Sequence, residues 1–133
     1  MLDSYKIQVR FSDLDVLGHV NNAVYLSYFE MARVAYFSKF VGVNWDWEKQ
    51  GVLLRKNEIE YLYPVFLHQE PEIKIYTKNI GTKSFTLDYG LTVNNILCTT
   101  GSSVLVCYDS IAKKTIEIPK ELMLLLKKLK KEE

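Results

Sequence analysis

A chain of 133 residues, 48% of them hydrophobic, is long enough to fold around a core of its own without disulfides or metals. Its 17 basic and 16 acidic residues leave a formal charge of +1, which argues against the strongly basic surface of nucleic-acid-binding domains. No apolar run approaches the roughly 20 residues of a membrane-spanning helix, and we expect no signal peptide. We therefore expect one cytoplasmic domain over residues 1–133.

The first predicted elements are a strand and a long helix. Alternating apolar and polar side chains predict the strand over residues 5–11, and a turn-rich stretch follows over residues 12–22. Residues 22–40 lack Gly and Pro, which predicts a helix whose first N–H groups are capped by Asn21 or Asn22. Because this helix is apolar on most sides, we expect other elements to enclose most of it.

The remaining chain alternates as antiparallel strands do. The predicted strands cover residues 52–62, 72–80, 84–93 and 96–108, with a short one after residue 114. Asn94-Asn95 is typical of a two-residue hairpin turn, since Asn tolerates the left-handed backbone conformation. An amphipathic helix opens at Pro119. This order predicts an α+β hotdog fold, in which an antiparallel sheet wraps around a long central helix.

The two cysteines are interpreted as packing residues. Cys98 and Cys107 lie in one predicted strand at an odd spacing, which would place them on opposite faces of the sheet. A reducing compartment is the default in the absence of a secretion signal, so we expect no disulfide.

Reactive side chains gather in the loop that precedes the long helix. A carboxylate there lies near the free N–H groups of the first helical turn, which can polarise a carbonyl and stabilise an oxyanion. A thioester needs no strong nucleophile, so Asp15 could attack the carbonyl or deprotonate a water. Simpler interpretations remain: Asp13 and Asp15 are typical turn residues, and His19 suits a core or capping role. A metal site is disfavoured because no further His or Cys cluster would complete it.

The motif D-x-D-x-x-G-H-V-N-N occupies residues 13–22 and resembles the signature of the 4-hydroxybenzoyl-CoA thioesterase family, in its branch of short acyl-CoA thioesterases. The resemblance implies a hotdog acyl-CoA thioesterase with no cofactor. The family's catalytic carboxylate falls on Asp15, and its carbonyl-polarising N–H groups fall on about Asn22 to Val24. His19 and Asn22 correspond to positions that line the site, so the resemblance implies catalytic roles for Asp15, His19 and Asn22.

A second resemblance concerns the grip on the substrate. Lys83-Ser84 begins a central strand, where the hydroxybenzoyl members hold the phosphates of coenzyme A. Gly81 and Thr82 replace the two arginines expected before it, which leaves Lys83 as the transferable phosphate ligand, unless it is only an exposed lysine at a strand end. The helix supplies aromatic residues that suit an acyl pocket or simply the core: Tyr25, Tyr28, Phe29, Tyr36 and Phe37.

We therefore expect hydrolysis of an acyl-CoA, or an acyl-carrier protein, to a free acid and a thiol. The substrate-binding residues expected from the two resemblances are Val24, Tyr25, Lys83 and Ser84. The rivals are a non-catalytic acyl-thioester-binding protein, which has no need of a carboxylate such as Asp15, and a hydroxyacyl-thioester dehydratase. The family's active sites form between protomers and the sheet has two edges, so we expect a homodimer or homotetramer. Glu30 and Arg33 are interpreted as a structural ion pair.

Overall fold

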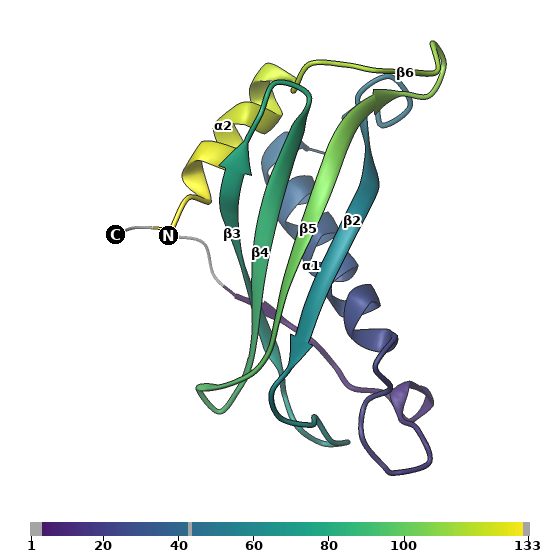
Figure 1. Ribbon diagram of the computed structural model, residues 1–133, viewed down its shortest axis with the longest axis vertical. Helices are drawn as coiled ribbons and strands as arrows, with labels where there is room; N and C mark the ends of the chain where they lie inside the picture. The colour runs from purple at the N-terminus through teal and green to yellow at the C-terminus, as the bar shows by residue number, and fades with distance from the viewer. Residues whose placement is uncertain (1–3, 43, 132–133) are drawn as a thin grey trace.

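A curved antiparallel sheet is the largest element of the computed structural model, which describes residues 4–42 and 44–131 (Figure 1). Its strands are β1 (Tyr5–Lys6), β2 (Gly51–Tyr61), β3 (Glu72–Ile80), β4 (Ser84–Val93), β5 (Ile96–Asp109) and β6 (Lys114–Thr115). The order across the sheet is β1-β3-β4-β5-β2, and β6 pairs with β5. Each pairing is antiparallel, as the alternating sequence predicts.

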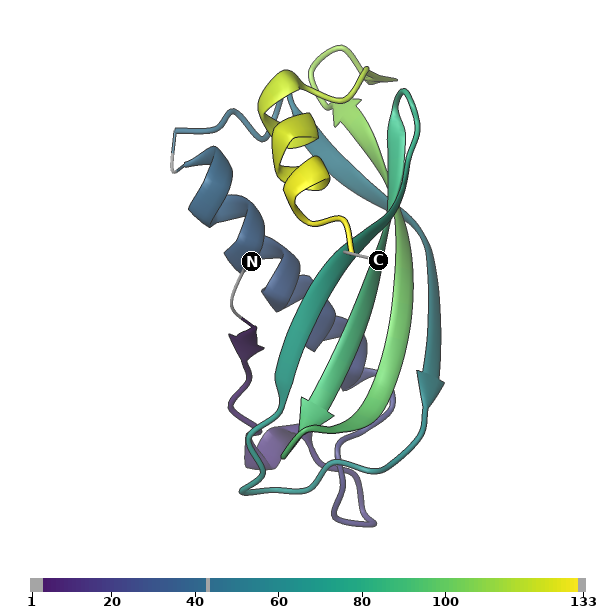
Figure 2. The same ribbon diagram turned by 90° about the vertical axis from the view of Figure 1, so that its left-hand side faces the viewer.

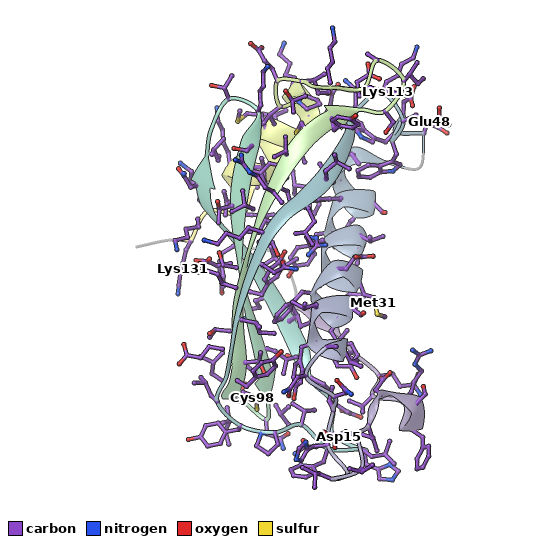
Figure 3. All side chains as sticks on the ribbon, turned by 45° about the vertical axis from the view of Figure 1, so that its right-hand side comes forward. Asp15, Met31, Glu48, Cys98, Lys113 and Lys131 are labelled. Atoms are coloured by element: carbon purple, nitrogen blue, oxygen red, sulfur yellow. The ribbon has the colours of Figure 1, made fainter. Side chains whose placement is uncertain are left out.

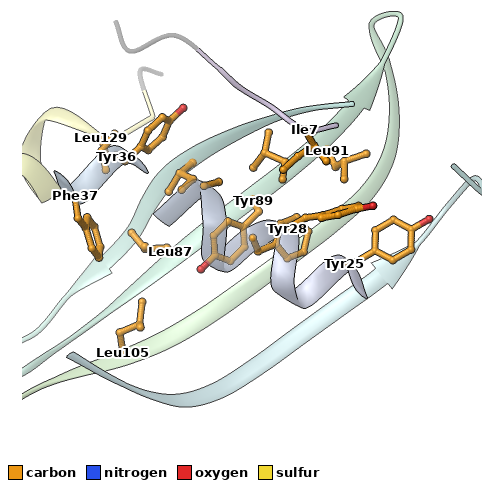
Figure 4. Packing of buried hydrophobic residues seen from close by; sticks show 14 of the residues in the cluster. Ile7, Tyr25, Tyr28, Tyr36, Phe37, Leu87, Tyr89, Leu91, Leu105 and Leu129 are labelled. Atoms are coloured by element: carbon orange, nitrogen blue, oxygen red, sulfur yellow. The ribbon is translucent and has the colours of Figure 1, made fainter. Parts of the chain in front are cut away.

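Two helices, α1 (Val24–Val41) and α2 (Lys120–Lys128), lie on the same face of this sheet (Figure 2). Side chains from both helices and from the strands meet in one core (Figure 4). Every second residue of β4 points inward and is buried, and the residues between them are half-buried. The buried residues are Phe85, Leu87, Tyr89, Leu91 and Val93. Neither helix of the described chain is long and apolar enough to cross a membrane.

Several predicted elements are confirmed. The bounds of β3 and β4 agree with the prediction, and the turn between β4 and β5 has positive φ angles of 52° at Asn94 and 65° at Asn95. The C-terminal helix is amphipathic as predicted: Leu122, Leu125 and Leu126 are buried together with its C-cap Leu129, whereas Leu124 is 58% exposed. These elements were predictable because each has one buried face, which imposes its period on the sequence.

The first strand is shorter than predicted. β1 ends at Lys6, and a 3-10 helix (Phe11–Asp13) occupies the end of the predicted strand. Lys6 pairs with Glu72, the first residue of β3, so the chain beyond it has little strand left to pair with. The expected alternation therefore fails at Phe11, whose side chain is 81% exposed.

The start and the surroundings of α1 also differ from expectation. The helix begins at Val24 with Ala23 as its N-cap, and the side chain of Asn21 accepts the Ala23 N–H at 3.0 Å from outside the helix. The outward side of α1 is open within the described chain, since Met31 is 47% and Val34 57% exposed. The helix is therefore covered by the sheet on one side and uncovered on the other.

The two cysteines are buried in the same core rather than on opposite faces. β5 carries an extra residue here, because Leu91 pairs with Thr99 while Thr92 pairs with Leu97. The skipped residue is Cys98, and this bulge reverses the expected alternation. Burial raises the pKa of both thiols, and that of Cys107 to about 11, so neither is an activated nucleophile.

Glu30 and Arg33 do form a pair, with 3.8 Å between the carboxylate and the guanidinium. The shorter contact of the buried Arg33 is a hydrogen bond of 2.9 Å to the hydroxyl of Tyr89 on β4. Phe29 stacks on the same tyrosine ring with 4.5 Å between centroids. These contacts fix α1 against the middle of the sheet.

Candidate active site

The predicted catalytic loop folds as a tight turn at one end of the molecule, where Asp15 is labelled in Figure 3. Leu14 and Val20 pair as an isolated antiparallel bridge, and the Asp15 N–H donates to the His19 carbonyl at 2.9 Å. The Gly18 N–H closes the turn onto the Asp15 carbonyl at 3.0 Å, with φ of 85° at Gly18. Asp at the first turn position and Gly at the fourth is a strong turn sequence. The loop therefore folds as its sequence directs.

The carboxylate of Asp15 has two unlike oxygens. Oδ1 accepts the N–H of Leu17 at 2.9 Å, the contact of an ordinary Asp turn. Oδ2 lies 3.5 Å from Nδ1 of His19, and the two side chains are 27% and 30% exposed. The turn thus orients the carboxylate through one oxygen and leaves the other beside an imidazole, within reach of solvent.

Neighbouring segments brace this loop. His19 pairs with Phe66 in the connection between β2 and β3, and the Val20 N–H donates to the Val65 carbonyl at 2.8 Å. The His19 ring meets the Phe66 ring edge to face at 5.9 Å. At the end of β2, the hydroxyl of Tyr61 donates to the carbonyl of Asn22 at 2.7 Å. The loop and the approach to α1 are therefore attached to the sheet's own connections.

The backbone N–H groups before α1 are not equally available. Asn21 accepts hydrogen bonds from two of them: its side chain accepts the Ala23 N–H, and its carbonyl accepts the Val24 N–H at 2.9 Å. Within the described residues no acceptor is found for the N–H of Asn22. Of the predicted donors at residues 22–24, Asn22 is therefore the one whose N–H is available to a ligand.

Asp13 has a role that its sequence position did not reveal. Its side chain is 4% exposed and accepts the Arg10 N–H at 2.9 Å and the Tyr28 hydroxyl at 2.7 Å. Burial acts to raise its pKa, but hydrogen bonds from Arg10 and Tyr28 and the charge of Arg10 hold the pKa below the ordinary value. Burial and the neighbouring carboxylate raise the pKa of Tyr28 in turn. The sequence held one sign of this role: the hydroxyl of a tyrosine buried in the core, such as Tyr28, needs a hydrogen-bond partner.

The predicted substrate residues lie in two places. Val24 is half-buried at the start of α1. Tyr25 is 2% exposed and packs between the rings of Tyr28, at 6.2 Å, and Tyr61, at 5.2 Å. Its ring is thus part of the core beneath the loop.

The turn between β3 and β4 contains Lys83 and leads into Ser84. This turn lies at the opposite end of the sheet from the loop before α1 (Figure 1). Ser84 is the first residue of β4, whose ten residues span about 30 Å at the usual rise of a strand. Within one chain the structure does not bring Lys83 to the Asp15 loop.

The rest of the described chain offers no alternative site that uses the predicted residues or a metal ion. A hollow of 1210 Å³ opens on the outer face of the sheet, and its lining includes none of the predicted site residues. Residues 4–42 and 44–131 contain no group of three or more His, Cys, Asp or Glu side chains arranged to hold a metal ion.

Comparisons with known proteins agree with this architecture. A family model described as the Thioesterase-like superfamily matches residues 9–126. YsmA of Bacillus subtilis (strain 168) is 34% identical over 102 residues, which cover 76% of this chain and 69% of that protein. YneP of the same strain is 29% identical over 118 residues, 86% of each chain.

A thioesterase from Thermus thermophilus, solved with coenzyme A and Zn, is 33% identical. It covers 95% of this chain and 92% of its own, with a TM-score of 0.82. The expected α+β hotdog architecture is therefore shared with thioesterases of known structure. The chain belongs to the thioesterase-like superfamily.

Proposed function

We propose that this protein hydrolyses acyl-CoA thioesters, with Asp15 as the catalytic carboxylate. The carrying observation is that a solvent-accessible carboxylate, Asp15, and a backbone N–H with no acceptor among the described residues, that of Asn22, belong to the same loop and helix approach. Two relatives support the substrate class: the Thermus thermophilus thioesterase was solved with coenzyme A, and YneP is provisionally named an acyl-CoA thioesterase.

The chemistry follows from these groups. The thioester carbonyl oxygen accepts a hydrogen bond from the Asn22 N–H, where the positive end of the α1 dipole stabilises developing negative charge. Asp15 either attacks the carbonyl carbon or removes a proton from an attacking water. The C–S bond then breaks and the thiolate of coenzyme A leaves; in the general-base route it receives the proton that Asp15 took from the water. In the direct-attack route a water then hydrolyses the acyl–Asp15 anhydride, which releases the free acid, restores the carboxylate and supplies the proton of the thiol. His19, beside Oδ2, orients the reacting oxygen of Asp15.

We also propose that the grip on coenzyme A involves a second copy of the chain. Lys83 and Ser84 lie far from the Asp15 loop of their own chain, so they would serve the site of a neighbouring protomer. Within the described residues, the outer edge of β2 has no partner strand and the outward side of α1 is exposed, which supports a homodimer or homotetramer. Half-buried Val24 would contact the acyl group at the helix start, and Tyr25, buried beneath the loop, would shape that end of the site through its packing.

The test compares free-thiol release by the wild type, Asp15→Asn and Asp15→Ala on acyl-CoAs of increasing chain length and on aromatic acyl-CoAs. We expect both variants to lose about 10²- to 10⁴-fold in kcat, the usual contribution of a positioned base. The matched control is Asp109→Asn. Asp109 also accepts the N–H two residues on, at 2.9 Å, but at the far end of the sheet.

Equal thiol release by the wild type and both Asp15 variants would refute the assigned role of Asp15. A wild type that binds acyl-CoA but releases no thiol from any acyl-CoA or acyl-carrier protein would favour the non-catalytic binder instead.

A further inference from the structure

Asp13 is a buried carboxylate that the proposed chemistry does not use. A carboxylate is costly to remove from water unless hydrogen bonds compensate its charge. Here Oδ2 accepts the Arg10 N–H and the Tyr28 hydroxyl, while Oδ1 lies 3.5 Å from the Arg10 guanidinium. Its partners thus include a residue of α1 that lies 15 positions further along the chain.

The backbone of Asp13 completes a closed circuit of hydrogen bonds. Its carbonyl accepts the Asn21 N–H at 2.9 Å, and Asn21 in turn accepts the N–H groups of Ala23 and Val24. The helix then runs one turn from Val24 to Tyr28, whose hydroxyl returns to the Asp13 carboxylate at 2.7 Å. The circuit joins the base of the loop to the first turn of α1.

Both proposed reacting groups are attached directly to this circuit. Asp15 follows Asp13 by two residues, just beyond the Leu14–Val20 bridge, and Asn22 follows Asn21 by one. We propose that Asp13 is a positioning residue, which through Tyr28 and Asn21 holds the carboxylate of Asp15 in register with the N–H of Asn22. This inference rests on the proposed thioesterase function and adds a residue that never touches the substrate.

The negative charge of Asp13 strengthens this circuit, because hydrogen bonds to an ionised acceptor are stronger than neutral ones. An asparagine could place its carbonyl oxygen where Oδ2 lies, but it would lose the charge and turn its NH2 group toward the Arg10 guanidinium, where Oδ1 now lies. Loss of the circuit would let the Asp15 turn move relative to α1. A misplacement of about 1 Å in a reacting group can cost about 100-fold in rate.

The experiment uses Asp13→Asn and Tyr28→Phe, the second of which removes only the hydroxyl. Asp46→Asn is the matched control, because Asp46 accepts the N–H groups of Glu48 and Lys49 in an exposed turn. Glu48 of this turn is labelled at the opposite end of the molecule from Asp15 in Figure 3. Thiol release gives kcat and KM, and hydrogen exchange compares residues 14–19 with β4, at a temperature where circular dichroism shows every variant folded.

We expect kcat to fall about 10- to 100-fold in Asp13→Asn and less in Tyr28→Phe, with KM nearly unchanged. Backbone amide hydrogens should exchange faster in residues 14–19 and at an unchanged rate in β4. If Asp13 only stabilised the fold, kcat of the folded variant would equal that of the wild type. Should Asp13→Asn fail to fold, Tyr28→Phe decides.

Unchanged exchange in residues 14–19 would overturn the positioning role, and faster exchange with an unchanged kcat would overturn its importance for catalysis. An inactive wild type would refute the proposed function instead, and the exchange data would then decide alone whether Asp13 fixes the loop.

Discussion

Asp13 and Asp15 lie two residues apart, yet they have different environments. Asp13 is buried and its oxygens are occupied, while Asp15 keeps one oxygen beside His19 and in reach of solvent. When two carboxylates share a site, such differences assign their roles. The accessible residue is suited to chemistry and the buried one to architecture.

The buried carboxylate should also matter for stability. At pH 7 we expect Asp13→Asn to lower the free energy of unfolding by about 1.5–3 kcal/mol, the range for hydrogen bonds to a charged group. Urea unfolding followed by circular dichroism measures this. Asp46→Asn should have a smaller effect, because Asp46 is exposed.

This contribution should depend on pH. The pKa of Asp13 is held below its ordinary value of 3.8, so the folded state binds its proton less tightly than the unfolded state. The stabilisation is therefore complete above the ordinary pKa and is lost as the pH falls through the folded-state pKa. The difference between wild type and Asp13→Asn should shrink below pH 3.8; a difference that grows on acidification would contradict the assignment.

At the scale of the elements, α1 approaches the sheet closely over Gly101 of β5. A Cβ at Gly101 would lie 2.7 Å from Cε2 of Phe29 and 3.3 Å from the carbonyl of Glu58. Phe29 is 1% exposed and stacked on Tyr89, so its ring has little freedom to move. We expect Gly101→Ala to lower the unfolding free energy by about 1–3 kcal/mol through overpacking.

The control for this prediction is Gly90→Ala on the adjacent strand. A Cβ there would meet only Cδ1 of Leu97, at 3.4 Å, an ordinary contact. Thermal unfolding should show Gly90→Ala near the wild type and Gly101→Ala clearly below it. Equal melting temperatures would mean that Phe29 yields and that the helix is not held at this distance.

Sequence reasoning succeeded where one buried face controls many residues. β4 alternates along its whole length and β3 alternates up to Thr77, beyond which its pairing with β4 shifts, so the bounds of both were readable. The prediction failed where a partner ends or shifts: Lys6 is the last residue with a strand beside it, and Cys98 is skipped by the pairing of β5 with β4. These failures depend on neighbouring strands, which a single segment does not reveal.

In the candidate site, too, the local turn could be predicted from the sequence and the contacts with other elements could not. The Asp15 turn follows from local sequence, since Asp and Gly occupy the turn positions that favour them. The burial of Asp13 depends on Tyr28, and that contact exists only once α1 has packed beside the loop. The hydrogen bonds from the N–H groups of Ala23 and Val24 to Asn21 likewise depend on the backbone conformation before the helix, which the sequence alone did not reveal.

At the scale of the whole molecule, two surfaces remain open. β2 ends the sheet and, in the described chain, pairs only with β5, and its Leu53 and Leu54 are 49% and 46% exposed. The outward side of α1 exposes Met31 and Val34. A long unpaired edge with apolar side chains is a site where another chain pairs.

We therefore expect the protein to elute as a dimer or tetramer in size-exclusion chromatography with light scattering. Leu54→Glu and Val34→Glu should shift it toward the monomer, because each would bury a charge in the proposed interface. Leu124→Glu is the control, since Leu124 is 58% exposed on α2. A monomeric wild type would contradict the proposed assembly, and a monomeric variant should lose activity if Lys83 serves a neighbouring site.

The turn that carries Asp15 has a fixed base and an open tip. Val16 is fully exposed and Leu17 is 73% exposed, and the hydrogen bonds that close the turn use only backbone atoms and the Asp15 carboxylate. Neither tip side chain is needed to hold the carboxylate in place. Mutations at these two positions can therefore accumulate without disturbing the fold, so they offer natural selection and protein engineering a place to alter substrate preference or to attach a fluorescent label.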